Sequence, residues 1–275
     1  MQSTSVMPPV SRDAWLRWTL GLLPFVVMAG LYLWASHVRL EANPQDKLLP
    51  SLPRMFEAMW PLIFEADPRT GQYQFLADTW ASVRRIAIGV IVAALAGLFT
   101  GVNMGLHRRV KDMFGPFLTF VSLIPPLAVL PILFIALGVE EFSKITLIFI
   151  GVYPLIARDV LLATEQIPQE NLVKALTLGA TRTGIAYRLV MPQVLPQLID
   201  TVRLALGAAW LFLIAAEAIA STEGLGYRIF LVRRYLAMDV ILPYVAWIVF
   251  LGFASDWLLR FWLRRRFRWY NVGQH

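Results

Sequence analysis

Few residues of this chain have the types and spacing that chemistry requires. The sequence contains no cysteine, so it offers neither a thiol nucleophile nor a thiolate metal site. Its three histidines are His37, His107 and His275, and their separations match no metal-ligand spacing. The sequence has no Gly-Lys pair for a phosphate-binding loop and no G-x-S-x-G elbow. Enzyme chemistry therefore has no support, and transport, signalling or scaffolding remain.

One acid stands inside an apolar run, where Glu217 interrupts LFLIAAEAIA. An ionisable group within a membrane span is costly and usually faces the bundle interior or a watery cavity. We therefore treat Glu217 as a candidate pathway or gate residue. Two alternatives stay open: a carboxylate bonded to a neighbouring helix, or one that is wet near the outer interface. A charged Glu217 would repel an anionic cargo, which favours a role in holding helices together.

Charged pairs stand near the inner ends of two other runs. Arg203 and Asp200 precede one run, and Arg158 and Asp159 close another. Their positions favour ion pairing at the inner interface, with an inner gate as the alternative. Arg203 is the candidate gate residue among them.

Three prolines interrupt the run SLIPPLAVLP, namely Pro125, Pro126 and Pro131. A proline in a membrane helix frees backbone groups, which neighbours or a cavity must then satisfy. We expect a kinked or broken helix at this place. A role in shaping a transport pathway is the sharper hypothesis, and plain kinking is the alternative.

These candidates require a scaffold embedded in lipid. The 275-residue chain is 58% hydrophobic and 16% charged, whereas soluble domains usually carry about a quarter charged residues. A bilayer core of about 30 Å needs about 20 helical residues. Six largely apolar runs have this length: 18–38, 86–107, 113–139, 145–163, 203–221 and 240–263. The predicted fold class is all-α, a polytopic membrane protein with about six transmembrane helices.

The runs divide the chain into segments with predicted locations. The first run is too long for a cleavable signal peptide, so we interpret it as a retained span. The distribution of Lys and Arg favours cytoplasmic termini, and the strongest contribution comes from RFWLRRRFRW. We interpret that cluster as a headgroup anchor, so no nucleic-acid partner is expected. The expected segments are a cytoplasmic segment 1–17, a first helix 18–38, an extracytoplasmic loop 39–78, a five-helix core 79–263 and a basic tail 264–275.

Two loops carry helical patterns of their own. In the loop 39–78, Met55, Met59, Leu62 and Ile63 recur at helical spacing, which predicts a short surface helix. The cytoplasmic loop 164–193 is polar enough for water, and a helix is predicted over about 169–180.

The predicted helix of the cytoplasmic loop has clear start and stop signals. Pro168 and Glu170 suit its first turn, and Gly179 can end it in the left-handed conformation. Leu172, Ala175 and Leu176 share one apolar face. From periodicity alone, that face could lie on the lipid surface, on the chain's own spans, or in a groove of another protein.

The same loop carries a resemblance to a known family. It is similar to the motif E-A-A-x3-G-x9-I-x-L-P of bacterial ABC-transporter permease subunits, with Ala175, Gly179 and Pro192 at the matching positions. Val173 and Lys174 replace the motif's Glu and first Ala. The blocks TWASVRRIAIGVIVAALAGLFTGVNMG, SLIPPLAVLPILFIALGVEEFSK and MPQVLPQLIDTVRLALGAAWLFLIAAEAIASTEGLGYRI also resemble the family. The match covers roughly residues 76–270 and is closest to the nitrate/sulfonate/taurine/bicarbonate group.

This resemblance implies a type I ABC-importer-like permease fold in a bacterial inner membrane. It implies two ATPase subunits that carry ATP and Mg, a second copy of the permease and an extracytoplasmic solute-binding protein. The chain itself would bind no cofactor. The residues implied in ATPase coupling are Leu172, Lys174, Ala175, Leu176, Gly179, Ala180 and Pro192.

The expected function is import of a small polar solute, of the oxyanion type that the resemblance suggests. One alternative is a stand-alone secondary transporter or channel, although no clear repeat relates the two halves. A second is an importer of a small nitrogenous compound, and a membrane scaffold is a third class.

Overall fold

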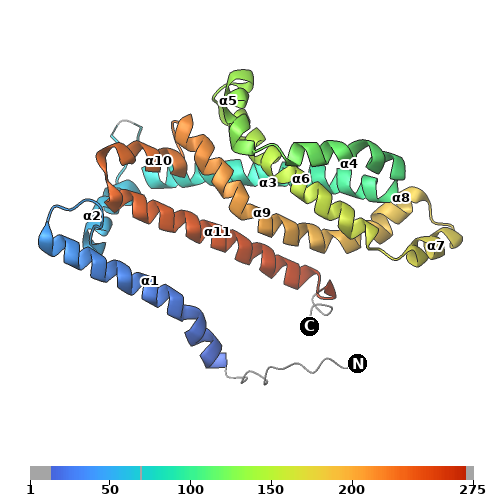
Figure 1. Cartoon of the computed structure of the whole chain (residues 1–275), viewed down its shortest axis with the longest axis horizontal. Helices are drawn as coiled ribbons and strands as arrows, with labels where there is room; N and C mark the ends of the chain where they lie inside the picture. The colour runs from blue at the N-terminus through green and yellow to red at the C-terminus, as the bar shows by residue number, and fades with distance from the viewer. Residues whose placement is uncertain (1–13, 69, 271–275) are drawn as a thin grey trace.

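The protein is an elongated assembly of helices, described by a computed structural model over residues 14–68 and 70–270 (Figure 1). Most of the predicted segment 1–17 and the last five residues of the predicted tail 264–275 lie outside the described residues. In chain order the elements are α1 (Ala14–Ala42), α2 (Leu52–Phe64), α3 (Gln74–Leu106), α4 (Arg108–Ser122), α5 (Pro126–Leu137), α6 (Glu141–Glu165), α7 (Gln169–Thr177), α8 (Arg182–Ile185), the π-helix η1 (Ala186–Val190), α9 (Met191–Ile219), α10 (Leu225–Val232), the 3₁₀ turn η2 (Arg233–Tyr235) and α11 (Met238–Arg266).

Five helical stretches of the described chain are long and apolar enough to cross a membrane, and the bent pair α4–α5 makes up to six. The five are α1, α3, α6, the continuous stretch Thr183–Ile219 and α11. The predicted count of about six is confirmed. The boundaries differ, because charged residues at the ends of a span stay helical: α3 begins at Gln74, inside the predicted loop 39–78, and α11 continues to Arg266.

The predicted break in the third span is confirmed. The axes of α4 and α5 meet at 96°, and the break lies between Ser122 and Pro126. Pro125 is the N-cap of α5 and Pro126 is its first residue. Proline has no N–H and keeps the preceding residue out of the helical region, so the helix cannot continue through this pair. Figure 1 shows α5 projecting away from the row of long helices.

The centre of the bundle is the close contact of α3 with α6. A stripe of small residues runs along α3 at intervals of four, and each glycine in it meets a β-branched residue of α6. A Cβ added at these glycines would lie 2.4–2.8 Å from a side-chain carbon of α6. Small residues let helix backbones approach closely, which is how helices associate in lipid. The facing pairs are Gly89 with Ile148, Gly97 with Ile156, Gly101 with Val160 and Gly105 with Thr164.

Burial separates central from peripheral spans. In the most apolar windows of α3, α6 and α9, 39% of residues are buried, against 11% in α11 and 6% in α1. Figure 1 shows α1 standing apart from the other long helices. The side chains of α1 and α11 are therefore the chain's main contribution to an outward-facing apolar surface.

The predicted surface helix in the loop is α2, and its predicted face is confirmed. Met59 is buried in the main core, and Met55, Leu62 and Ile63 are partly buried. This face packs on α11 and α3.

Candidate functional site

Most of the candidate residues lie towards one or the other end of the bundle. We call these the α10 end and the α7 end, after the helix that lies at each. Glu217 lies in the last turn of α9, at the α10 end, and is completely buried. Its carboxylate accepts hydrogen bonds from Arg85 Nη1 at 2.7 Å, Ser82 Oγ at 2.8 Å and the Gly226 N–H at 2.9 Å. The structure thus places Glu217 between helices, bonded on every side to protein groups.

Arg85 of α3 is the centre of these contacts, and its side chain is 1% exposed. Its Nε donates to Glu141 at 2.8 Å and its Nη2 to the same carboxylate at 2.5 Å. Its Nη1 also donates to the Glu223 carbonyl at 2.9 Å. Each nitrogen of the guanidinium has a protein acceptor, so Arg85 has no free side for a cargo anion.

Arg85 was not predicted from the sequence to have a role, and it only marked the start of the apolar run 86–107. A signal was present, because Arg85 stands four residues before Gly89 and therefore on the packed face of α3. An arginine on that face must be buried together with acids from the helices around it.

Three successive backbone amides at the start of α10 are bound by side chains from other helices. The Gly224 N–H donates to Asp78 Oδ1 at 3.0 Å, and the Leu225 N–H donates to Ser82 Oγ at 2.9 Å. The Gly226 N–H is the one that Glu217 binds. The first N–H groups of a helix have no partner within it and carry partial positive charge, so acids suit them. The α9–α10 turn is thereby bound to α3.

The position at the start of this turn requires a glycine. Gly224 has φ of +125°, and an added Cβ would lie 2.5 Å from the Glu217 carboxylate. The tight turn between α9 and α10 therefore occurs at Gly224, and α10 begins immediately after it.

A second ion pair supports the same turn. Arg228 of α10 donates to Asp78 Oδ2 at 2.8 Å, and the Tyr244 hydroxyl of α11 donates to the same atom at 3.2 Å. Burial alone would lower the pKa of Arg228, but the bond and charge of Asp78 raise it above the ordinary value. We call Asp78, Ser82, Arg85, Glu141, Glu217 and Arg228 the polar cluster.

Arg203 lies on α9 nearer the α7 end and joins two helices. It pairs with Asp200 on its own helix, and its Nε donates to Asp256 of α11 at 2.9 Å. Asp256 also accepts from Arg260 at 2.8 Å. Asp159 of α6 accepts from Thr201 Oγ1 at 2.9 Å. The expected ion pair of Arg203 with Asp200 is present, whereas Asp159 accepts a hydrogen bond instead. The gate role of Arg203 stays a prediction.

The predicted helix of the polar loop is α7, which ends at Thr177 rather than at Ala180. The Gly179 N–H donates to the Leu176 carbonyl at 2.9 Å, and the Ala180 N–H donates to the Ala175 carbonyl at 3.0 Å. This bond pattern closes a helix through a left-handed residue, and Gly179 has φ of +83°. Two of the motif positions, Ala175 and Gly179, therefore serve together to end α7.

The apolar side chains of α7 fall into two groups. Leu172 and Ala175 are partly buried against the main core. Val173, Leu176 and Leu178 are 59%, 53% and 88% exposed. Lys174 is exposed and stands 3.8 Å from Glu170, one turn earlier. The predicted apolar face is thus divided, because Leu172 and Ala175 pack on the chain's own spans and Leu176 stays uncovered. Val173 and Leu178 add to the uncovered surface, although the sequence did not predict them there.

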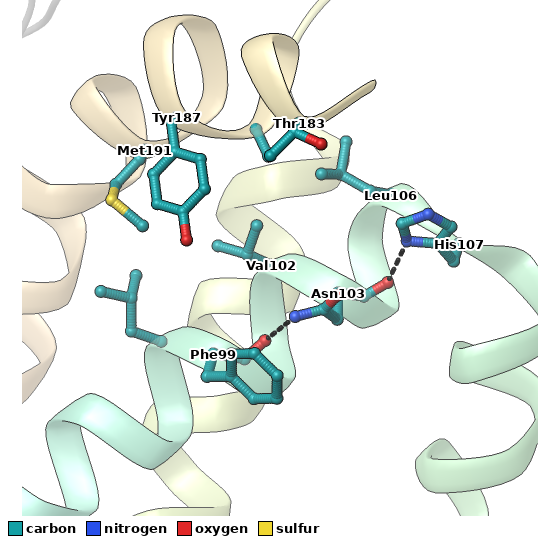
Figure 2. A pocket seen from close by; sticks show the side chains of 10 residues that line it. Phe99, Val102, Asn103, Leu106, His107, Thr183, Tyr187 and Met191 are labelled. Carbon is teal, nitrogen blue, oxygen red and sulfur yellow. Dashed lines mark hydrogen bonds between the residues drawn. The ribbon is translucent and has the colours of Figure 1, made fainter. Parts of the chain in front are cut away.

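Two cavities lie beside the last turn of α3. Figure 2 shows a cavity of about 290 Å³ between the last turns of α3 and the segment α8–η1, with Phe99, Asn103, His107 and Tyr187 on its wall. Asn103 Nδ2 donates to the Phe99 carbonyl at 2.7 Å, so this amide is already engaged along α3. A second cavity of about 270 Å³ is lined by Leu106, His107, Leu172, Leu176 and Ile185. Leu172 and Leu176 of α7 therefore border an open space beside the last turn of α3.

Pro192 stands where the polar loop becomes a span. It is the second residue of α9, directly after the π-helix η1, and the Met191 N–H donates to the Ala186 carbonyl. Proline has no N–H, so it fits where the regular bond pattern changes. Pro125 and Pro126 lie at the α4–α5 bend, and Pro131 lies within α5.

The described residues hold no group of three or more His, Cys, Asp or Glu side chains that could bind a metal. The arrangement consists of a largely buried cluster of paired charges at one end and an amphipathic helix with exposed apolar side chains at the other.

Several known proteins are similar to this chain in sequence. The chain is 34% identical over 194 residues to the taurine transport system permease protein TauC of Escherichia coli (strain K12), which covers 70% of each chain. It is 32% identical to the bicarbonate transport system permease protein CmpB of Synechococcus elongatus, over 68% of each chain. It is 29% identical to the nitrate import permease protein NrtB of Synechocystis, over 66% of each chain.

Solved structures show the same fold. A chain from the crystal structure of a bacterial alginate ABC transporter, in complex with a periplasmic protein, matches with a TM-score of 0.62 and 14% identity, covering 91% of this chain and 94% of that one. A chain of the inward-facing MetNI methionine ABC transporter matches with a TM-score of 0.56 and 20% identity, covering 68% and 94%. The fold is that of ABC importer permeases. Residues 89–268 match the corresponding family, and the chain belongs to the binding-protein-dependent transport system inner membrane components.

Proposed function

We propose that the chain is the membrane-spanning subunit of an ATP-driven importer and that it docks on a cytoplasmic ATPase subunit through α7. The observation that carries the proposal is the uncovered apolar group Val173, Leu176 and Leu178 on a helix outside the spans. An amphipathic helix that lays an apolar face into a groove is a common mode of recognition. ATP and Mg would bind to the ATPase subunits, and this chain would contribute no catalytic residue.

The orientation and assembly follow from the same proposal. The α7 end faces the cytoplasm together with both termini, and the α10 end faces the extracytoplasmic binding protein. A full transporter would contain two permease chains and two ATPase subunits. The positive-inside bias supports this orientation, because α11 ends in Arg264, Arg265 and Arg266.

The proposed cargo is a small solute of the oxyanion type. The support is the set of relatives, whose names assign them to taurine, bicarbonate and nitrate transport. The polar cluster is not the cargo site in this proposal, since Arg85 and Glu217 are fully engaged with each other and with the protein. Uptake assays on the reconstituted transporter with each of these solutes, and with a small nitrogenous compound, would rank the candidates.

The docking proposal is tested by adding charge to the uncovered surface. Leu176→Asp should abolish co-purification with the co-expressed ATPase subunit and should remove ATP-dependent uptake, because a carboxylate cannot enter an apolar groove. Gln166→Glu adds one negative charge to the exposed start of the same loop and should leave both unchanged.

Two results would contradict the proposal. One is unchanged co-purification of the Leu176→Asp chain, which would place the ATPase contact elsewhere. The other is full uptake by the chain without ATP, which would indicate a secondary transporter or channel.

A further inference from the structure

The short helix α2 has a second apolar face that the chain leaves uncovered. Phe56, Trp60 and Phe64 recur every four residues and form a stripe opposite to the face that packs on the bundle. Their exposed fractions are 63%, 47% and 58%. The ring centroids of Phe56 and Trp60 are 5.5 Å apart, and those of Trp60 and Phe64 are 4.5 Å apart. The three rings thus form one continuous aromatic surface.

Hydrogen bonds fix the level of α2 along α1. The Tyr32 hydroxyl donates to the Pro50 carbonyl at 2.7 Å, and Ser36 Oγ donates to the Leu49 carbonyl at 2.9 Å. The chain leaves α1 at Ala42, so the loop turns back along α1 before α2 begins at Leu52. At a rise of 1.5 Å per residue, Tyr32 lies roughly 15 Å below the end of α1. The start of α2 is therefore level with the apolar part of α1.

That level lies inside the bilayer. The charge-free part of α1 ends before Arg39 and has the length of a bilayer core. Tyr32 is several residues inside this limit, roughly 9 Å by helical rise from the last uncharged residue. Arg54 and Glu57 are the only charged residues of α2. A helix at this level meets the boundary between headgroups and acyl chains.

Two of the spans beside α2 are those with the fewest buried residues. Its inner face packs on α11, and its leading loop is bound to α1. Only 11% and 6% of the residues in the apolar windows of α11 and α1 are buried. Figure 1 shows α2 beside the ends of both helices. The aromatic stripe is thus continuous with the apolar periphery of the molecule.

We propose that α2 is partly immersed in the leaflet at the α10 end and that Phe56, Trp60 and Phe64 contact lipid acyl chains. Aromatic side chains are enriched at this depth, and an amphipathic helix lying in the interface buries its apolar face in the same way. The segment thus belongs to the membrane-embedded part of the protein, although its place in the sequence is within a predicted extracytoplasmic loop.

The absence of cysteine permits a direct test, since single cysteines can be placed and spin-labelled without background. The full chain would be reconstituted in vesicles of phosphatidylethanolamine and phosphatidylglycerol. Labels would be placed by Phe56→Cys, Trp60→Cys and Phe64→Cys. A fourth label would be placed by Leu52→Cys, which is also on the exposed side of α2 and leaves all three aromatic rings in place. Collision with lipid-soluble oxygen and with a water-soluble nickel complex would then be measured by electron paramagnetic resonance.

Three control positions calibrate the result. Val27→Cys, in the exposed middle of α1, reports lipid, and Gln72→Cys, in the exposed turn before α3, reports water. Met59→Cys, on the buried face of α2, reports protein contact. All four labels on the exposed face should show an oxygen-to-nickel ratio nearer to that of Val27 than to that of Gln72.

Either of two other outcomes would overturn the proposal. A ratio like that of Gln72 would place the stripe in water. Low access of both reagents, as at Met59, would mean that a second copy or another protein covers it. The measurement needs no transport, so its result is independent of whether the proposed import function holds.

Discussion

At the scale of single residues, the pair Arg85 and Glu217 determines how this apolar bundle accommodates charge. Removing one partner of a buried ion pair is costly, because the remaining group keeps its desolvation without its bond. Here Glu217 also binds Ser82 and the Gly226 amide, so one substitution leaves several donors unsatisfied. We therefore interpret Glu217 as a residue that holds helices.

We expect Glu217→Ala to lower the free energy of unfolding by about 3 kcal/mol, since each unsatisfied buried donor costs about 1–3 kcal/mol. Thermal unfolding of the purified chain in detergent would measure it. Glu165→Ala is the control, because Glu165 is an exposed partner of Lys111 and such pairs contribute about 0–1 kcal/mol. If Glu217→Gln matched the wild type in both stability and transport, no charge at this position would be required.

Asp46, in the loop after α1, gives a prediction for acid conditions. The Leu48 amide and the Arg39 side chain lower the pKa of Asp46 below its ordinary value. The stabilisation is therefore complete above the ordinary pKa of about 4 and is lost as the pH falls through the lower pKa of the folded state.

The expected result is that Asp46→Asn lowers the Tm at neutral pH and that the gap to the wild type closes under acid conditions below about pH 4. Thermal unfolding across a pH series would measure the gap. A gap that stayed constant throughout the series would show that ionisation of Asp46 contributes nothing.

At the scale of elements, the contact of α3 with α6 depends on the missing side chains of the glycine stripe. A Cβ at Gly101 would lie 2.7 Å from the Ala157 carbonyl oxygen, which is a backbone atom and cannot rotate away. Gly207 of α9 meets nothing within 4 Å, although it also stands in a spanning helix. The two positions therefore separate packing from helix propensity.

Gly101→Ala should destabilise the chain by about 1–3 kcal/mol through overpacking. Gly207→Ala should be neutral or slightly stabilising, because alanine favours helix. Thermal unfolding of the two variants side by side would measure the difference. Equal Tm values for the two variants would contradict the close approach of α3 and α6.

At the scale of the whole molecule, the two ends differ in how firmly they are held. The α10 end is bound by buried carboxylates and arginines, whereas α7 has exposed apolar side chains and no buried residue. Regions with few buried contacts open at low free energy. We expect the amides of Leu225–Val232 to exchange hydrogen more slowly than those of Gln169–Thr177.

Hydrogen exchange with mass spectrometry on the full chain in vesicles would compare the two segments. Addition of the ATPase subunit should slow exchange in Gln169–Thr177 and leave Leu225–Val232 unchanged. Faster exchange at the α10 end would contradict a firmly held polar cluster.

Much of the fold could be predicted from the sequence, because span length and proline position are local properties. The six runs, the α4–α5 break and the buried face of α2 with Met59 followed from charge-free intervals and periodicity. Gly179 was identified as a helix end for the same reason.

The polar cluster could not be predicted in the same way, because its members come from distant parts of the chain. Arg85 and Glu217 are 132 residues apart in sequence, and no local pattern joins them. The length of α9 was also underestimated, since a span was expected to begin at Arg203, whereas α9 begins at Met191. Arg203 stays inside this helix because it pairs with Asp200 and Asp256. The division of α7 into covered and uncovered side chains depends on how the spans behind it pack.

The continuous helix from Thr183 to Ile219 limits which insertions this chain can tolerate. One added or deleted residue would turn everything beyond it by about 100°. Glu217 would then leave Arg85, and the Gly226 amide would lose its acceptor. Differences in length among related chains should therefore avoid this helix and fall in the loops beside it. The π turn Ala186–Val190 already holds one residue more than a regular α-helical turn, so deletion of one residue there would restore the α-helical pattern and leave the register of Glu217 intact.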